Sequence, residues 1–314
     1  MGIKWLPIIL ILIVFISGCL EDGKEVKPEF YDNALKMEFE ITEETQGKKI
    51  LPGQIIRVVV SLKNQVENDT TNVDVYISDP YGMKVTQINC DEGSPIDHNG
   101  QPYGWQFDSI QSLDEQEIVF SLKVPTKEEL AMIGRRLKPE FTLKYDYAGI
   151  SMRYVPILAE GEKIGEKSSE FTQTYGPIHV DIDTDKWVRE GDIMPVYVDV
   201  KDVVNSKSEI EIDKDYFRVF WVNQYFVMST ELVRCDFNAI SSSSFGEGCP
   251  DNCDCYTRPE NMNIILPLDV PFVCALEVKD PLAPMAMGLI GAEYEYRYEV
   301  VKTKTIEVET ELFD

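Results

Sequence analysis

Two segments of the chain alternate between apolar and polar residues with a period of two. In residues 55–64 (IIRVVVSLKN), the apolar side chains of Ile56, Val58 and Val60 fall on one side of an extended backbone. Residues 193–202 (IMPVYVDVKD) follow the same pattern. Because β-branched residues dominate both segments, we predict strands that bury one face in a core.

The two segments belong to a longer internal repeat. Residues 53–64 match residues 191–202 position by position at an offset of 138. The match extends in both directions. Upstream, Glu29-Phe30 corresponds to Glu170-Phe171, and the alternating residues Met37, Phe39 and Ile41 correspond to Ile178, Val180 and Ile182. Downstream, residues 141–147 correspond to residues 290–296. The repeat predicts two copies of one domain, at 29–158 and 170–314, joined by a polar linker at 159–169.

Helical periodicity is convincing in one short segment, residues 126–137. Thr126 is a capping residue, Glu129 stands three residues later, and Pro139 lies just past the end. Elsewhere, turn residues divide short apolar runs at the spacing of a β-sandwich. One short helix is compatible with an all-β fold.

In each copy a glycine leads into a valine-rich strand that ends at Asn64 or at Asp202. This pattern resembles the immunoglobulin-like modules, akin to the CARDB type, of archaeal and bacterial surface proteins. The resemblance covers about one strand pair per domain, so it implies architecture rather than a ligand. It implies an all-β protein with two tandem immunoglobulin-like β-sandwich domains after an N-terminal signal and lipid-anchor segment.

The N-terminus carries an uncharged apolar run at residues 5–16. As a helix this run would rise only about 18 Å, well short of a hydrocarbon core about 30 Å thick. Lys4 precedes the run, and the small residues 17–18 are followed directly by Cys19. This order is similar to the lipobox of prokaryotic lipoprotein signals.

The lipobox resemblance implies that residues 1–18 are a signal peptide and that Cys19 becomes a diacylated N-terminus. Residues 19–28 would then form an acidic tether. Two acyl chains hold a protein on a membrane durably, so the resemblance implies a lipid-anchored protein at the cell surface. The alternatives are a short uncleaved anchor and a buried apolar N-terminal helix.

Composition restricts the partners. The chain has 314 residues, of which 55 are acidic and 30 basic, for a formal charge of −25. Such a surface repels nucleic acid and anionic lipid headgroups. We therefore exclude nucleic-acid binding and expect the body to stand off the membrane. The hydrophobic content of 44% is that of a folded chain.

Assigning Cys19 to lipid leaves an even number of cysteines in an exported chain. Five of the six lie between residues 235 and 274, and an even number outside the cytosol predicts disulfides. The candidates are Cys90, Cys235, Cys249, Cys253, Cys255 and Cys274. The spacing does not choose among the connectivities. Zinc or an iron–sulfur cluster at residues 249–255 is the alternative, although paired C-x2-C motifs and nearby histidines are missing.

Catalytic signals are scarce in this sequence. It has two histidines, His98 in a predicted loop and His179 in a predicted strand. The motifs G-x-S-x-G and H-E-x-x-H and a Walker-type phosphate loop do not occur. We therefore expect no enzyme activity and no cofactor. Glycan hydrolysis by a pair of carboxylates is the alternative.

Two weaker site signals are a carboxylate run and a glycosylation sequon. Asp181, Asp183 and Asp185 alternate along a predicted strand, which suggests either a calcium loop or the acidic outer face of that strand. Lys186 occupies the sixth position, where a calcium loop requires glycine. Asn68 begins an Asn-x-Thr sequon in a predicted loop.

Aromatic residues supply the candidate binding surfaces. Residues 216–227 are apolar on both alternating faces, which predicts a strand buried on both sides, in a core or at an interface. Trp221 and Tyr225 are the candidates in this stretch. Tyr103 and Trp105 are expected in a loop, either exposed to a carbohydrate or protein partner or folded onto the sandwich.

Together these patterns predict a membrane-anchored, extracytoplasmic binding or structural module of a prokaryotic cell envelope. We expect the prokaryote to be an archaeon. The partners would be the membrane, through Cys19, and an envelope protein or a glycan. The first alternative is a subunit of a larger envelope assembly such as a surface layer, pilus or secretion complex. The second alternative is a glycan-acting hydrolase.

Overall fold

The structure is a computed structural model, and its described part begins at Ala34. It describes residues 34–309 except residues 67, 99, 163–168, 175, 203–209, 213–216, 230–234, 240–252, 258–263, 267–269 and 282. Strands dominate this part of the chain, which confirms the predicted all-β sandwich class. None of its helices has the length and apolar character needed to cross a membrane. The predicted signal peptide, Cys19 and the whole of the predicted tether lie outside the described residues.

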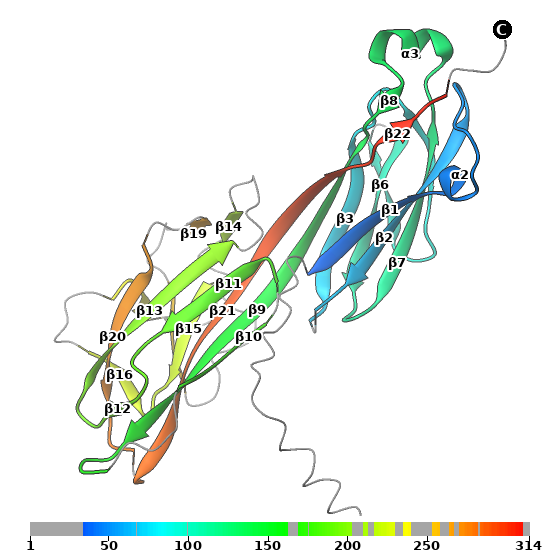
Figure 1. Ribbon diagram of the computed structural model, residues 1–314. Helices are drawn as coiled ribbons and strands as arrows, with labels where there is room; N and C mark the ends of the chain where they lie inside the picture. The colour runs from blue at the N-terminus through cyan, green and yellow to red at the C-terminus, as the bar shows by residue number, and fades with distance from the viewer. Residues whose placement is uncertain are drawn as a thin grey trace, which may run out of the picture. The chain divides into compact units, whose positions relative to one another are not determined.

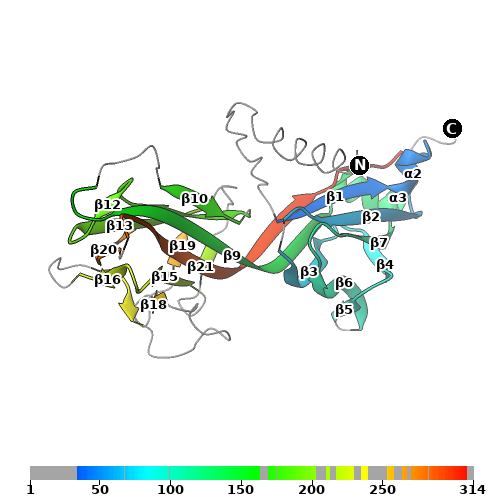
Figure 2. The same cartoon turned by 90° about the horizontal axis from the view of Figure 1, so that it is seen from below.

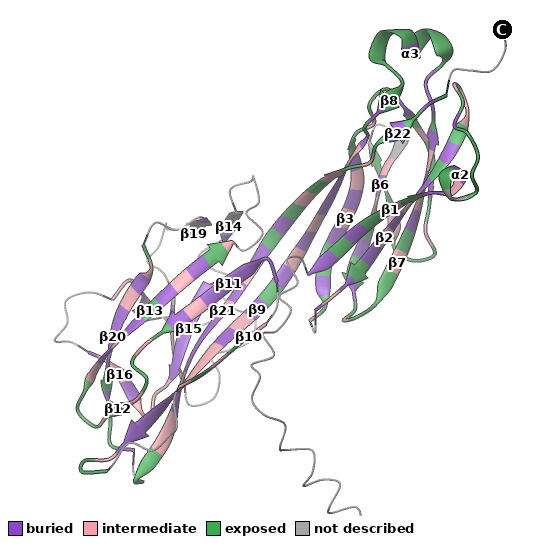
Figure 3. Cartoon of the chain, viewed as in Figure 1, coloured by how far each residue is buried: buried purple, intermediate pink, exposed green. Residues whose placement is uncertain are grey.

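The first sheet contains four antiparallel strands. Their order is β1 (Leu35–Ile41), β2 (Ile55–Asn64), β7 (Glu115–Lys123) and β4 (Lys84–Asn89) (Figures 1 and 2; β4 is labelled in Figure 2). Buried and less buried residues alternate along β2, as Figure 3 shows, so the predicted period of two is confirmed.

The largest sheet contains ten strands. Eight follow one path, β17 (Asn238–Ala239), β18 (Cys253–Thr257), β15 (Phe217–Val222), β21 (Met285–Thr303), β9 (Glu140–Leu158), β3 (Thr70–Asp79), β6 (Gln101–Ile110) and β5 (Ser94–His98). Two more strands, β10 (Glu170–Gln173) and β12 (Val188–Arg189), pair with β9.

A third sheet has the order β11 (Ile178–Asp183), β13 (Ile193–Asp202), β20 (Phe272–Val278) and β16 (Phe226–Met228). Two small sheets pair β14 (Ile210–Ile212) with β19 (Ile264–Leu266) and β22 (Ile306–Glu307) with β8 (Arg136–Leu137). In the described part of the chain, the helices are α2 (Thr42–Thr45) and α3 (Lys127–Ile133). Thr126 and Glu129 form the predicted capping box of α3. The predicted helix end at residue 137 is wrong, because α3 ends at Ile133, before Gly134 with its φ of 92°, and Arg136–Leu137 form β8.

Aromatic side chains join the sheets into sandwiches. In the first sandwich, Phe141 of β9 packs on Phe120 of β7 and on Phe39 of β1, with ring centroids 5.3 and 4.9 Å apart. In the second sandwich, Phe217 of β15 packs on Phe272 of β20 at 6.3 Å. These side chains are buried or packed against the buried core.

Strand pairing shows the internal repeat. β1, β2, β7 and β4 correspond to β11, β13, β20 and β16, and the large sheet has matching halves on either side of the β9–β21 pair. The register corrects one detail of the sequence alignment. Phe39 pairs with Val60, and Ile182 pairs with Val198, so Phe39 corresponds to Ile182 and not to Val180. The first strands are therefore shifted by two residues, which preserves the inward face and so leaves no trace in the apolar pattern.

The two sandwiches share a continuous ribbon made of β9 and β21. The strands pair from Glu140 with Thr303 to Leu158 with Met285, and Figures 1 and 2 show them side by side. An offset of 149 residues maps Tyr147 of β9 onto Tyr296, its own cross-strand partner, so this pair is the centre of the repeat.

This ribbon changes the interpretation of the predicted linker. Residues 159–169 connect β9 to β10, and these two strands pair antiparallel within one sheet. The chain crosses between the sandwiches inside β9 and β21 instead. Residues 296–303, assigned from the sequence to the second domain, pair with residues 140–147 of the first. A polar, glycine-bearing composition suits a hairpin loop as well as a linker.

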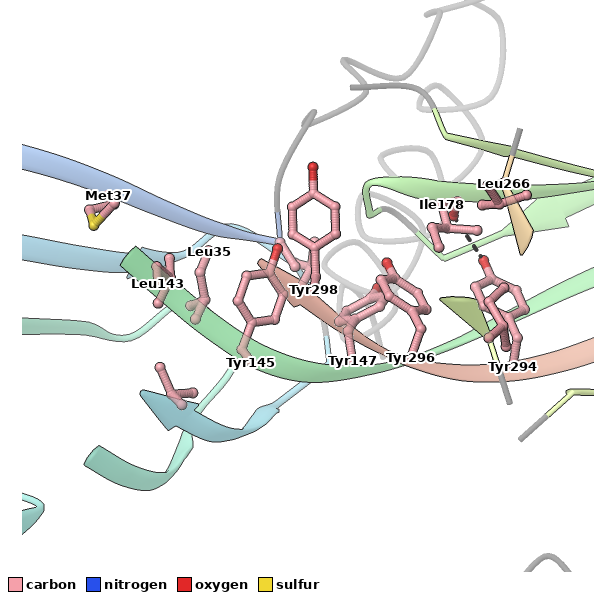
Figure 4. Packing of buried hydrophobic residues seen from close by; sticks show 14 of the residues in the cluster. Leu35, Met37, Leu143, Tyr145, Tyr147, Ile178, Leu266, Tyr294, Tyr296 and Tyr298 are labelled. Atoms are coloured by element: carbon pink, nitrogen blue, oxygen red, sulfur yellow. Dashed lines mark hydrogen bonds between the residues drawn. The ribbon is translucent and has the colours of Figure 1, made fainter. Parts of the chain in front are cut away.

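Five buried tyrosines line one face of the ribbon. Tyr145 and Tyr147 come from β9, and Tyr294, Tyr296 and Tyr298 come from β21 (Figure 4). The rings lie 5.7 Å apart both for Tyr147 with Tyr296 and for Tyr145 with Tyr298. Each such pair contributes about 0.5–1.5 kcal/mol beyond its buried area. Burial raises the pKa of Tyr145 and of Tyr296 well above the usual range, so both hydroxyls stay neutral.

Gly149 makes room for one of these rings. It lies opposite Tyr294, and a Cβ atom at this position would meet two ring carbons of Tyr294 at 2.5 Å. The Tyr294 hydroxyl donates a hydrogen bond of 3.3 Å to the carbonyl of Ile178 (Figure 4). The glycine therefore allows a ring of β21 to reach the first strand of the third sheet.

The opposite face of the ribbon carries ion pairs. The Arg297 guanidinium lies 2.7 Å from Asp74 and 3.0 Å from Asp146, and the Lys144 ammonium lies 2.9 Å from Glu299. These contacts connect β3, β9 and β21. Partly exposed pairs contribute at most about 1 kcal/mol each, so the tyrosine face supplies most of the stabilisation.

We expect Gly149→Val to lower the free energy of unfolding by about 1–3 kcal/mol, because the new side chain overlaps the Tyr294 ring. Thermal unfolding followed by circular dichroism measures the change. Ala148→Val is the matched control, since Ala148 is exposed on the opposite face of the same strand. Equal melting temperatures for the two variants would contradict the role assigned to Gly149.

Candidate functional site

The second sandwich has a hollow on its surface, here called the groove. Its volume is about 540 Å³, within the range of small-molecule sites. It is lined by charged and aromatic side chains and by two smaller apolar residues, namely Arg153, Phe171, Asp181, Ile182, Asp183, Tyr197, Asp199, Lys201 and Pro271. Both signs of charge and two aromatic rings therefore meet in one concave surface.

The floor of the groove comes from the paired strands β11 and β13. Asp181 lies directly opposite Asp199, and Asp183 lies opposite Tyr197. Like charges in opposed positions are destabilising unless a cation relieves them. The Lys201 ammonium does so, with one oxygen of Asp181 and one of Asp199 each at 2.8 Å. The hydrogen bonds of Lys201 hold its pKa well above the usual range, and the bond to Asp181 has a larger effect than the bond to Asp199.

One wall of the groove comes from β9 and β10. Arg153 pairs in register with Phe171, and the guanidinium carbon lies 5.9 Å from the Phe171 ring centroid. The same guanidinium lies 3.8 Å from Asp183, longer than a hydrogen bond. Its Nε atom is buried and has no hydrogen-bond partner among the described residues. Arg153 is thus held in place by packing, while its pairing with Asp183 is loose.

The calcium hypothesis gains no support from this geometry. Asp181 and Asp183 face the groove but are engaged by Lys201 and Arg153, while Asp185 lies beyond the end of β11 and is exposed. In the described part of the chain, no three acidic, histidine or cysteine side chains gather closely enough to hold a metal ion. Asp181 and Asp183 lie on the outer face of β11, which agrees with the other interpretation for these two residues.

The first sandwich provides an internal comparison. By strand register, Glu38 corresponds to Asp181 and Lys63 to Lys201, so these charges are shared. At the position of Tyr197 the first sandwich has Val59, and at the position of Asp199 it has Ser61. Lys302 corresponds to Arg153 and donates to the carbonyl of Met37 at 2.9 Å. The aromatic ring and the opposed carboxylate are therefore particular to the second sandwich, and the repeated fold does not require them.

The candidate aromatics of residues 216–227 are part of the interior. Trp221 is 1% exposed and stacks on Tyr256 with ring centroids 4.1 Å apart, so it is not a binding surface. β15 is buried on both faces, as predicted, but it ends at Val222. Tyr225 lies in the turn that leads to β16 and packs against the core. The apolar run thus passes from one sheet to the other, which its composition cannot show.

The other two candidates lie on a strand instead of the expected loop. Tyr103 and Trp105 belong to β6. The Tyr103 ring stacks on Tyr76 at 4.9 Å, and the Trp105 indole donates a 2.6 Å hydrogen bond to the carbonyl of Glu92. Both side chains are partly buried, so they act mainly in packing.

Disulfides occur in the second sandwich, as predicted. Cys235 and Cys274 are bonded, which ties the segment before β17 to β20. Cys255 of β18 is also disulfide-bonded. The strand β18 begins at Cys253, so Cys253 and Cys255 point to one side of it and Asp254 points to the other. The bond at Cys255 removes a thiolate that the zinc or iron–sulfur alternative needs.

The expectation that all six cysteines pair is not met. Cys90, just after β4, is a free thiol in the first sandwich. Burial raises the pKa of this thiol and so disfavours its reactive form. The other five cysteines lie in the sequence of the second sandwich. The even number of cysteines does not indicate how far apart they lie in space, so it could not show that Cys90 stays unpaired. Cys249 is outside the described residues.

Asn68 and His179 both have structural contacts. The side-chain amide of Asn68 donates to the carbonyl of Ala148 at 3.1 Å. A glycan on this nitrogen would disturb that hydrogen bond, and glycosylation stays a prediction. The Nδ1 atom of buried His179 lies 3.3 Å from the Gln173 amide nitrogen, beside the groove. His98 lies on β5 rather than in a loop.

Most of the groove was not predicted from the sequence. The carboxylates of Asp181 and Asp183 were singled out, but Arg153, Tyr197 and Lys201 were not. A usable signal existed in the repeat, where the two copies differ at Val59 and Tyr197. No protein-family model and no curated protein matches this chain. The chemistry of the groove is therefore the basis for a functional proposal.

We expect Lys201→Gln to lower the free energy of unfolding by up to about 1 kcal/mol, because Asp181 and Asp199 lose the cation between them. Thermal unfolding at low salt measures the loss, which should shrink at about 1 M NaCl through screening. Lys63→Gln is the matched control, since Ser61 replaces the second carboxylate there. A loss that is equal in both variants would argue against the Asp181–Lys201–Asp199 cluster.

Proposed function

We propose that this protein is a lipid-anchored, extracytoplasmic binding module of a prokaryotic cell envelope, and that the groove is its ligand site. The groove carries the binding part of the proposal, because it combines polar side chains with the exposed ring of Tyr197, at a position where the first sandwich has Val59. A residue that is dispensable for the fold but placed in a concave site is better explained by binding than by packing.

The anchor part of the proposal rests on the sequence. The apolar run at 5–16 and the small residues before Cys19 have the order of a lipoprotein signal. The disulfide between Cys235 and Cys274 agrees with a location outside the reducing cytosol. A location on the membrane surface would present the groove to envelope components.

Binding is favoured over catalysis because Lys201 engages both opposed carboxylates of the groove. Glycoside hydrolysis needs one carboxyl group that can donate a proton and a second that acts as base or nucleophile. A pair held by a common ammonium is arranged for charge balance and hydrogen bonding instead. In the alternative in which this chain is a subunit of an envelope assembly, the groove would be the docking face. Trp221 and Tyr225 do not suit that role, because Trp221 is buried and Tyr225 packs against the core.

Intact-mass analysis of the protein extracted from its native membranes tests the anchor. We expect a chain that begins at Cys19 and carries the mass of a diacylglyceryl group, and we expect Cys19→Ala to abolish both the processing and the membrane association. A retained Met1, or an unmodified Cys19 on a membrane-bound chain, would overturn the lipid anchor.

Photo-cross-linking in native membranes tests the groove. Tyr197 is replaced by p-benzoylphenylalanine, and Val59 is replaced in the same way as the matched control, because the two residues occupy equivalent strand positions. We expect a discrete adduct from position 197 and none from position 59. If position 197 gives no adduct, or if both positions give the same adducts, the groove is not the ligand site.

A further inference from the structure

The groove offers hydrogen-bond acceptors that the described residues leave open. Lys201 uses the Oδ2 atoms of Asp181 and Asp199, and no donor among the described residues reaches the Oδ1 atom of either. The Oδ1 atom of Asp183 accepts from the backbone N–H of Thr184, which leaves its Oδ2 atom open as well. Three carboxylate oxygens are therefore available to a ligand that donates hydrogen bonds.

The charges of the groove are nearly balanced. Three carboxylates face two cations, and Lys201 and Arg153 already pair with these carboxylates. A strongly charged ligand would have to displace an existing ion pair and would pay for its own desolvation. A neutral ligand with hydroxyl groups can donate to the open carboxylate oxygens and accept from Lys201 without breaking a pair. The electrostatics thus favour a neutral, hydroxyl-rich ligand.

The apolar part of the groove suits a ring with C–H faces. Tyr197 is 40% exposed, so one face of its ring is accessible from the groove that it lines. Phe171 stands on the wall beneath Arg153, and Pro271 lines the groove as well. Aromatic rings next to polar groups are the arrangement that packs against an apolar ring face while its edge is hydrogen-bonded.

We propose that the groove binds a neutral saccharide, with a pyranose-type ring against Tyr197 and hydroxyl groups bonded to Asp181, Asp183 and Asp199. This inference rests on the proposed function, because it names the ligand class of the same site. The first sandwich keeps the charges at Glu38 and Lys63 but lacks the aromatic ring and the opposed carboxylate. It therefore serves as a natural negative control within the chain.

A glycan array probed with the disulfide-bonded protein, followed by calorimetry on the glycans that are retained, tests the inference. The array carries neutral, acidic and amino oligosaccharides. We expect retention on neutral oligosaccharides, with Tyr197→Ala weakening binding about tenfold. Asp199→Ser, which installs the residue found in the first sandwich, should also weaken binding. The controls Val59→Ala and Glu38→Gln should bind like the wild type, and circular dichroism verifies that every variant is folded.

The failure of this inference is distinguishable from the failure of the proposed function. The adduct formed at position 197 in native membranes is treated with periodate, which cleaves vicinal diols to pairs of aldehydes, and then with a hydrazide reagent that labels aldehydes. Hydrazide labelling of the adduct, with none on the chain that formed no adduct, supports a saccharide. A periodate-resistant protein adduct, together with no binding to neutral oligosaccharides, would overturn the saccharide while the groove stays a ligand site. Retention on acidic or amino glycans alone would overturn the neutral ligand class.

Discussion

The antiparallel pairing of β9 with β21 is the interaction on which both sandwiches depend. One half of each strand belongs to the first sandwich and the other half to the second. The tyrosines at the centre of the pair are buried. The first sandwich therefore includes residues 296–303, which lie near the end of the chain. Contacts over such long sequence separations slow folding, since the loop entropy is lost before the contacts compensate it. The first sandwich is complete only when β21 is paired with β9.

The same ribbon positions the groove. Arg153 belongs to β9, a few residues beyond the tyrosine pairs, and it reaches Asp183 on the first strand of the third sheet. Tyr294 of β21 bonds to the first residue of that strand, Ile178, and Gly149 gives its ring the necessary space. The packing that joins the sandwiches thus also fixes the edge of the groove, whose charged side chains lie on strands and not on loops.

Duplication separates the requirements of the fold from those of the site. Residues that both sandwiches share, such as Val60 and Val198, are buried and belong to the core. Residues that differ, such as Ser61 and Asp199, lie on the outer face, where packing does not restrict them. The chain therefore carries an internal comparison, between its own two halves.

The sequence by itself determined the strands at 55–64 and 193–202, the repeat and the capped start of the helix, because each depends on local periodicity or on residues within a few positions of one another. It could not show that β21 returns to the first sandwich, since the apolar pattern of a strand does not identify its partner. For the same reason it left Trp221 undecided between a core and a binding surface. Only the tertiary structure decided the groove, because Arg153, Asp183 and Lys201 come from three strands and meet through pairing and packing alone.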